Sequence, residues 1–471
     1  MNLEKMDRLI DAWRDEIFER LKGWIAIPSV NAPRSAENAP FGEQVRRMLD
    51  LFLSDARALG FEAEEFDGYC AHAVLHRGER NMGILAHLDV VPAGDGWTTP
   101  PFEGVLKDGR FYGRGAMDDK GPAMAALYAM RAVREAGIAL RDGVRLIVGC
   151  DEETGMTDMR HYAQVASLPD YGFSPDAEYP LINIEKGGLN LELSAAAPCD
   201  EKSALPVYEV WAGERVNVVP GVASALVGTD DVPALNARLE QIARAHENFS
   251  LCAKEEGCGR ARITATGVGA HASMPHLGVN AAGMLLIALS ELGAGGESFC
   301  SAAGALARKL GMEHDGTRLG IRISDSLSGA LTCNLGILRY DGLTLRARLD
   351  IRYPISADEQ TMCGQAAMAL RDTPISIRHA GGHTPLHVPA ESDVVRKLLA
   401  VYHEQTGLEP KALAIGGGTY SRMMPNTVGF GINFPGDTDT CHMPDEYVIV
   451  EKFMTSVHIM AHSIARLAGE E

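Results

Sequence analysis

The sequence predicts an α/β protein in which a mostly parallel-sheet domain is interrupted by an inserted α+β domain. Within residues 82–149, two short apolar runs lie on either side of a helical stretch, an order typical of a buried parallel sheet. After residue 186 the strands alternate apolar and polar residues instead, which is typical of a half-exposed antiparallel sheet. The 471 residues also exceed what one hydrophobic core usually serves. We therefore predict that residues 1–186 and 382–471 form one domain and that residues 187–381 form the insertion.

The first domain is predicted to open with a helix. Apolar residues recur every three or four positions over residues 3–24, and Pro28 ends this amphipathic pattern. Residues 82–91 and 144–149 are predicted to be buried strands, with a helix at residues 121–136 between them. This part of the chain therefore has the βαβ connection of a parallel sheet.

The insertion is predicted to combine alternating strands with two helices. Its clearest element is a hairpin over residues 331–353, in which Asp341-Gly342 supplies the turn and Asp350 and Arg352 lie on the same face. The other predicted strands are residues 189–195, 207–212 and 261–266, and the helices are residues 232–246 and 279–292. Gly381-Gly382 and Pro385 then mark the return to the first domain, where residues 392–406 are predicted to form a helix.

Composition excludes several classes of partner. A formal net charge of −19 argues against nucleic acid and anionic membranes, because their phosphates would repel the protein. The charged first residues lack the apolar core of roughly 7–15 residues that a signal peptide has, and no apolar run reaches the ~20 residues that span a bilayer. Nine scattered cysteines without a CxxC pair fit reduced thiols better than a disulfide framework. We therefore expect a cytoplasmic protein.

Five short motifs place possible metal ligands beside strand ends or in loops. They are His87-Leu88-Asp89, Asp118-Asp119, Asp151-Glu152-Glu153, Asp176 within Pro175-Asp176-Ala177-Glu178, and His442 within Cys441-His442-Met443-Pro444-Asp445-Glu446. Each alone has an ordinary interpretation, such as a structural histidine, a helix N-cap or a solvated loop. Together they supply the carboxylates and imidazoles that two metal ions about 3.5–4 Å apart require.

The same segments resemble a known family. AHLDVVP, GRGAMDDKGP, DEETG, SPDAEYPLINIEKG, HASMPHLGVNA, IRYP, GGGTYSR and HMPDEY occur in order over residues 27–460. This pattern is similar to that of the co-catalytic di-metal metallopeptidases of the aminoacylase and carnosinase type, and within them most resembles the bacterial peptidase V dipeptidases. The resemblance implies a metal-dependent hydrolase of unblocked dipeptides, with a catalytic domain in two sequence pieces and an inserted lid domain.

Carried over residue by residue, the resemblance implies a metal-binding set. Asp118 would bridge two divalent ions, zinc first, with manganese or cobalt as alternatives, and the peptide bond after Asp118 would be cis. His87 and Asp176 would complete one site, and Glu153 and His442 the other. Asp89 would orient His87, and Glu152 would be the general base.

The resemblance also implies functional residues in and near the insertion. His271 would stabilise the oxyanion, Asn217 and Arg352 would bind the substrate carboxylate, and Gly417 and Thr419 would present a backbone N–H and a hydroxyl to the same group. Because residues 187–380 are a long insertion, we expect His271 to act within its own chain in a monomer, with a dimer as the alternative.

Two other functions stay open at this point. One is an N-acyl-amino-acid amidohydrolase, a deacylase or desuccinylase of the same family. The other is a non-catalytic protein that binds metal or peptide, against which Glu152 and His271 argue because a binder needs ligands but no base.

Overall fold

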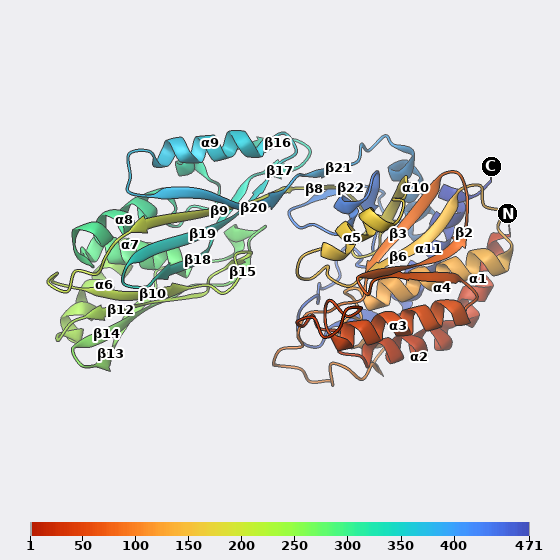
Figure 1. The fold of residues 1–471 in the computed structure, drawn as a ribbon, viewed down its shortest axis with the longest axis horizontal. Coiled ribbons are helices and arrows are strands. Elements are labelled where there is room, and N and C mark those ends of the chain that lie inside the picture. Colours follow the sequence, from red (N-terminus) through yellow and green to blue (C-terminus); the bar gives the residue numbers. More distant parts are fainter. Residues whose placement is uncertain (1, 471) are drawn as a thin grey trace. The chain divides into compact units, whose positions relative to one another are not determined.

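The structure is a computed structural model that describes residues 2–470 and divides into two compact units (Figure 1). Unit 1 comprises the residues up to Ile184, Leu386–Leu413, and the residues from Gly418 onwards; unit 2 comprises Glu185–Pro385 and Ala414–Gly417. The predicted fold class is confirmed, since unit 1 contains a sheet with parallel central strands and unit 2 combines an antiparallel sheet with helices. The assignment of residues 1–186, 187–381 and 382–471 to a catalytic and a lid domain stays a prediction.

Unit 1 contains most of the helices. Its elements are α1 (Leu3–Ala12), α2 (Arg14–Ile25), α3 (Glu43–Ala58), β1 (Glu62–Phe66), β2 (Cys70–His76), β3 (Asn81–His87), β4 (Val105–Lys107), β5 (Arg110–Tyr112), α4 (Lys120–Ala136), β6 (Gly143–Gly149), α5 (Thr157–Val165), β7 (Tyr171–Ser174), β8 (Leu181–Glu185), β21 (Leu386–His387), α10 (Asp393–Thr406), β22 (Ala412–Ile415), the 3-10 helix η3 (Tyr420–Met423), β23 (Thr427–Gly429), β24 (Tyr447–Ile449) and α11 (Val450–Ala468). The last residue of β8 and the last two of β22 belong to unit 2.

The main sheet of unit 1 has parallel strands at its centre and antiparallel strands towards its edges. Its order is β1-β2-β6-β3-β7-β23-β8-β21. The pairs β6–β3, β3–β7 and β7–β23 are parallel, whereas β1–β2, β2–β6 and β23–β8 are antiparallel. The carboxyl ends of β3, β6 and β7 therefore meet at one edge of the sheet, where ligand sites of such sheets form.

The central strands are buried on both faces because helices cover both. Ile84 and Leu146 face a core that α3, α4 and α11 share. Leu85 and Ile147, one position further on, face a second cluster with α5 and η3, as the alternation of side chains along a strand requires. This explains why these strands appear in the sequence as continuous apolar runs.

Unit 2 contains mainly strands. Its elements are β9 (Gly187–Ala196), β10 (Val207–Ala212), β11 (Val218–Val219), β12 (Val222–Gly228), α6 (Val232–Ala245), β13 (Leu251–Gly257), β14 (Arg260–Thr266), β15 (Ala270–His271), the 3-10 helix η1 (Pro275–Leu277), α7 (Ala281–Leu292), α8 (Gly296–Lys309), the 3-10 helix η2 (Thr317–Leu319), β16 (Ser324–Asp325), β17 (Gly329–Ala330), β18 (Thr332–Tyr340), β19 (Thr344–Tyr353), α9 (Glu359–Leu370) and β20 (Ser376–His383).

The sheet of unit 2 is antiparallel throughout, in the order β13-β14-β12-β10-β18-β19-β9-β20. The predicted hairpin is β18–β19. Of the apolar residues that alternate along its second strand, Leu345, Ala347, Leu349 and Ile351 are buried, whereas Leu343 lies before β19 and is exposed. Helix α7 packs on β12, β14 and β18. The Asn280 side chain accepts hydrogen bonds from the first N–H groups of α7 and fixes where that helix begins.

One predicted helix is divided into two in the structure. Residues 3–24 were expected to form a single helix, but α1 ends at Ala12 and α2 begins at Arg14, with Trp13 between them at φ −94° and ψ 4°. The Trp13 indole packs edge-on against Tyr128, with Arg131 4.0 Å above its ring. We attribute the break to this packing against α4, which the helical pattern of the sequence does not encode. Among residues 2–470, the helices fall short of the combined length and apolarity that crossing a membrane demands.

Candidate metal centre

Three of the five motifs lie at the carboxyl ends of neighbouring parallel strands. His87 is the last residue of β3, residues 151–153 follow β6, and Asp176 follows β7. Strand β3 lies between β6 and β7. The order of strands therefore brings an imidazole and several carboxylates to one edge of the sheet.

Asp118 lies in the loop before α4, and the buried side chain of Glu446 holds this loop in place. The Oε1 atom of Glu446 accepts hydrogen bonds from the backbone N–H groups of Gly115, Met117 and Asp118, at 3.0, 2.9 and 3.1 Å. Its Oε2 atom lies 2.5 Å from Arg114 Nη1, and both side chains are almost fully buried. Glu446 thereby ties the loop that contains His442 to the loop that contains Asp118.

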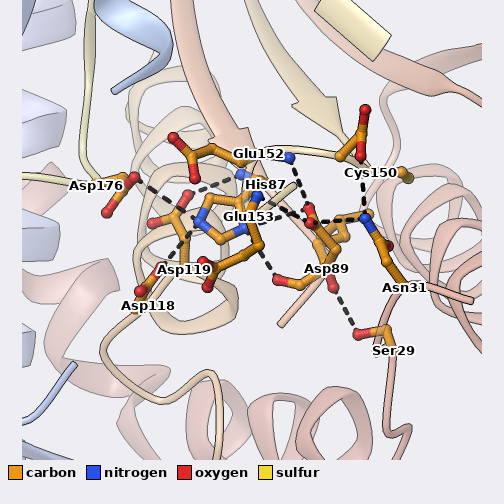
Figure 2. A network of polar contacts seen from close by, with 12 residues as sticks. Ser29, Asn31, His87, Asp89, Asp118, Asp119, Cys150, Glu152, Glu153 and Asp176 are labelled. Carbon is orange, nitrogen blue, oxygen red and sulfur yellow. Dashed lines mark hydrogen bonds and ion pairs between the residues drawn. The ribbon is translucent and has the colours of Figure 1, made fainter. Parts of the chain in front are cut away.

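The side chains from these motifs converge. His87 Nε2 lies 2.9 Å from Asp118 Oδ1 and 3.7 Å from Asp176 Oδ2, while His442 Nε2 lies 2.9 Å from Asp118 Oδ2 and 3.0 Å from Glu153 Oε1. Ligand atoms of His87, Asp118 and Glu153 all lie within 4.8 Å of one another. Figure 2 shows His87 at the centre of the carboxylates, with Asp118 and Asp176 on one side and Asp89 on the other. All five predicted ligands are therefore brought together.

Burial disfavours the charged form of several of these carboxylates. Burial raises the pKa of Glu152 and Glu153 above their ordinary values and that of Asp176 to about 7. Asp118 differs: burial acts in the same direction, but hydrogen bonds from His442 and His87 bring the pKa of Asp118 below its ordinary value. Clustered, desolvated carboxylates of this kind require a nearby positive charge.

The imidazoles supply part of that charge. Hydrogen bonds to Asp118 and Glu153 raise the pKa of His442 to about 10. Burial by itself would lower the pKa of His87, but hydrogen bonds of His87 with Asp118 and Asp89 outweigh burial and raise this pKa well above its ordinary value. The imidazole nitrogens of His87 and His442 thus face carboxylate oxygens, and divalent cations bind between such groups in imidazole and carboxylate sites. The donor set fits such cations.

Asp89 and Asp119 have separate roles around His87. His87 Nδ1 lies 2.9 Å from the backbone oxygen of Asp89 and 3.4 Å from its carboxylate, so Asp89 contacts the nitrogen that faces away from Asp118. Asp119 is the N-cap residue of α4, but its side chain does not cap the helix. Instead it accepts the backbone N–H of His87 at 2.8 Å. The Asp118–Asp119 peptide bond is cis, as predicted.

The adjacent glutamates differ in their contacts. Glu153 contacts His442, whereas the carboxylate of Glu152 has no hydrogen bond or ion pair with any residue in the described part of the chain. Figure 2 shows Glu152 among the carboxylates around His87. Their backbone N–H groups donate to Asp89, at 3.3 Å from Glu152 and 3.2 Å from Glu153. The two adjacent carboxylates therefore differ: Glu153 contacts an imidazole, and Glu152 does not.

Two of the predicted residues of unit 2, Asn217 and His271, lie at a pair of short strands. In the β11–β15 ladder, Val218 is opposite His271, and the backbone oxygen of Asn217 accepts the N–H of Ala272 at 2.9 Å. The His271 imidazole is exposed, and its Nδ1 atom lies 2.6 Å from Ser273 Oγ. Asn217 and His271 therefore lie close together.

Arg352 is already paired. Its Nε and Nη2 atoms contact the carboxylate of Asp350 at 2.6 and 2.8 Å, and its Nη1 atom donates to the Gly416 carbonyl at 3.3 Å. This last contact places Arg352 beside the segment that contains Gly417. Thr419 belongs to unit 1, where it is buried and its Oγ1 atom accepts the Ser421 N–H.

The sequence analysis missed several supporting residues. Glu446 and Arg114 lie inside quoted motifs but were given no role. Asn31, which donates to Asp151 at 3.2 Å and to Asp89 at 3.4 Å, and Asp158 were not singled out at all. Glu446 and Arg114 could have been noticed because they lie in HMPDEY and GRGAMDD, the segments that also contain predicted ligands. No local pattern distinguishes Asn31 or Asp158 from ordinary loop and helix residues.

Comparison with known proteins places the chain among peptidases. A sequence profile described as Peptidase family M20/M25/M40 matches residues 83–466. The "Putative dipeptidase YtjP" of Bacillus subtilis (strain 168) is 33% identical over 466 residues, which cover 97% of this chain and 98% of that protein. The "Beta-Ala-Xaa dipeptidase" of Lactobacillus delbrueckii subsp. lactis is 33% identical over 474 residues and 98% of each chain. Human carnosine dipeptidase 1 has a similar fold, with 15% identity and a TM-score of 0.61 over 99% of this chain and 98% of that chain.

Proposed function

The chain belongs to the peptidase family M20/M25/M40, and we propose that within this family it is a metal-dependent dipeptidase with Glu152 as the general base. The observation that carries the proposal is the division between two adjacent glutamates. Glu153 contacts His442, which also contacts Asp118, whereas the Glu152 carboxylate is left without a partner among the described residues. A hydrolase needs both a ligand and a proton acceptor, but a binding protein needs the ligand alone.

The proposed ligands form two groups that share one residue. His87, Asp118 and Asp176 would hold one divalent ion, and His442, Asp118 and Glu153 would hold the other. Bound ions would supply Lewis acidity toward the substrate carbonyl and a water molecule. Zinc suits the mixture of imidazole and carboxylate ligands, and manganese or cobalt are the alternatives.

The protein's own groups would move the protons. Glu152 would accept a proton from the attacking water and return it to the leaving amine, which requires a carboxylate that is not held by another side chain. His271 would stabilise the negative charge that develops on the carbonyl oxygen. Asp89 would keep His87 oriented through the nitrogen that faces away from Asp118.

Recognition of the free carboxylate would restrict the substrate to dipeptides. The guanidinium of Arg352 suits a carboxylate because it presents several N–H donors in a fixed plane. We propose that Arg352, Asn217, the Gly417 N–H and the Thr419 hydroxyl bind this group. Dipeptidase-named relatives that match along nearly the whole chain support this substrate over N-acyl amino acids.

The cell compartment proposed is the cytoplasm. All nine cysteines are free, and three of them are fully or almost fully buried. Unpaired thiols persist in a reducing compartment.

The test is hydrolysis of alanyl-alanine against N-acetyl-alanine, with zinc, manganese or cobalt added to metal-free protein. The proposal requires turnover of alanyl-alanine that depends on added metal and exceeds turnover of N-acetyl-alanine. Preference for N-acetyl-alanine would instead indicate the amidohydrolase, and binding of metal without hydrolysis of either compound would indicate a binding protein.

A further inference from the structure

Asp158 makes a set of hydrogen bonds that the proposed mechanism does not use. It lies in the first turn of α5, and its side chain is fully buried. Its Oδ2 atom accepts the backbone N–H groups of Cys150 at 2.5 Å and Asp151 at 2.7 Å, and its Oδ1 atom accepts the N–H of Met159 at 2.6 Å. Asp158 thus holds the backbone N–H groups of the two residues that directly precede Glu152.

Tyr420 completes this buried network. Its hydroxyl donates to Asp158 Oδ2, and its side chain is 1% exposed. The Tyr420 ring lies edge-on to the His87 imidazole, with 6.1 Å between ring centroids. The Tyr420–Asp158 hydrogen bond therefore connects the residue that holds the backbone before Glu152 to a ring that lies beside His87.

A neighbouring glycine shows how tightly this contact is packed. A Cβ atom at Gly149 would lie 2.2 Å from the Tyr420 hydroxyl oxygen and 2.3 Å from Asp158 Oδ2. Both values are far below van der Waals contact, so any side chain at Gly149 would displace the pair. The end of β6 therefore accommodates the Asp158–Tyr420 contact only because residue 149 has no side chain.

We propose that Asp158, together with Tyr420, is a positioning residue that fixes the loop of the general base Glu152. This inference rests on the proposed function. The N–H groups of Glu152 and Glu153 donate to Asp89 over longer distances, 3.3 and 3.2 Å, so the Asp158 bonds are a tighter constraint on this loop than those to Asp89. A displacement of about 1 Å in a catalytic group can cost on the order of 100-fold in rate.

The experiment compares Tyr420→Phe with a matched control, Tyr171→Phe. Each change removes one buried hydroxyl that donates to an aspartate of unit 1, since the Tyr171 hydroxyl donates to Asp142 at 2.7 Å. Tyr171 begins β7, at the end of the parallel strands opposite the candidate metal centre. Both variants lose a buried hydrogen bond, but only Tyr420→Phe disturbs the loop of Glu152.

We expect Tyr420→Phe to lower kcat about tenfold or more, with a smaller change in KM and an unchanged metal content. Tyr171→Phe should lower the unfolding midpoint to a similar degree and keep kcat within about twofold of the wild-type value. A kcat for Tyr420→Phe within about twofold of wild type overturns the proposal. Loss of metal in proportion to activity also overturns it, because the network would then maintain the ligands rather than the base.

Asp158→Asn provides a readout without substrate. Hydrogen exchange of the backbone amides at Cys150 and Asp151 should become faster in Asp158→Asn and stay unchanged in Tyr171→Phe. Unchanged exchange in Asp158→Asn contradicts the proposed constraint. If the wild-type enzyme cleaves N-acetyl-alanine instead of alanyl-alanine, the kinetic comparison is made with that substrate, so an incorrect substrate is distinguished from an incorrect positioning role.

Discussion

The Oδ2 atom of Asp118 lies 2.9 Å from Nε2 of His442. The Oδ1 atom of the same carboxylate lies 2.9 Å from Nε2 of His87. A single carboxylate thus faces one imidazole from the end of β3 and another from the loop before β24. This arrangement suits a carboxylate that bridges two cations.

Replacement of either Asp118 or His442 by alanine should remove bound metal and activity together. Each change deletes a proposed ligand, and metal ions contribute several kcal/mol to the transition state, so we expect a loss of roughly a thousandfold or more. Elemental analysis of the purified variants and assays at saturating metal test this. His403→Ala is the control, because His403 lies on α10 and contacts the backbone of Leu408. Full activity of Asp118→Ala at saturating metal would show that the ligand set is wrong.

The proposed binding of the substrate carboxylate by Arg352 leads to a prediction about substrate specificity. We expect Arg352→Lys to raise KM for alanyl-alanine about tenfold or more with a smaller change in kcat, because lysine lacks the planar fork of donors. Alanyl-alanine amide has no free carboxylate, so its hydrolysis should be slow in the wild-type enzyme and little affected by Arg352→Lys. An equal loss for both compounds would assign Arg352 a structural role.

The long insertion predicts that His271 acts within its own chain. Glu152→Gln and His271→Ala should each be inactive, and a mixture of the two should stay inactive after subunit exchange has been demonstrated. If His271 instead served a neighbouring subunit, one site of each mixed dimer would contain both intact residues. Recovery of activity in the mixture would falsify the in-chain assignment.

We expect the buried side chain of His72 to lower the free energy of unfolding in acid. Burial, followed by the positive charge of Arg145, lowers the pKa of His72 from 6.5 to about 4, and His72 Nδ1 lies 3.0 Å from the Tyr162 hydroxyl. The folded protein binds a proton at His72 less readily than the unfolded chain does. The free energy of unfolding is therefore not reduced by His72 protonation above about pH 6.5. As the pH falls from 6.5 towards 4, protonation of His72 in the unfolded chain lowers the free energy of unfolding by up to about 3 kcal/mol. Urea unfolding at pH 7 and pH 5 should show a smaller difference for His72→Gln than for wild type; equal differences would contradict this assignment.

Regular elements could be predicted well because their apolar periodicity reflects burial. Strands β3 and β6 are buried on both faces and appear as continuous apolar runs, which placed His87 and residues 151–153 at strand ends. The period-2 pattern of β19 also placed Asp350 and Arg352 on one face, where they form an ion pair. Asp118 and His442 lie in irregular loops, so their assignment depended on the family resemblance.

The supporting network could not be predicted because it depends on which polar side chains become buried together. Glu446 and Asp158 are both fully buried, yet in sequence each resembles an ordinary acidic residue. Their hydrogen-bond partners are either distant in the chain or backbone groups, so the residues next to them in sequence do not show that these carboxylates are buried and bonded. The break at Trp13 has the same origin, since it follows from packing against α4.

The central claim is that Glu152 is the base and Glu153 a ligand, and the paired variants Glu152→Gln and Glu153→Gln test it most directly. Both changes are isosteric and affect adjacent residues, so each serves as the control for the other. The measurement is bound metal per chain together with kcat for alanyl-alanine. We predict that Glu152→Gln keeps its metal and loses roughly 10²–10⁴-fold in kcat, whereas Glu153→Gln loses metal along with activity. Loss of metal from Glu152→Gln, or near-normal turnover by it, would contradict the account.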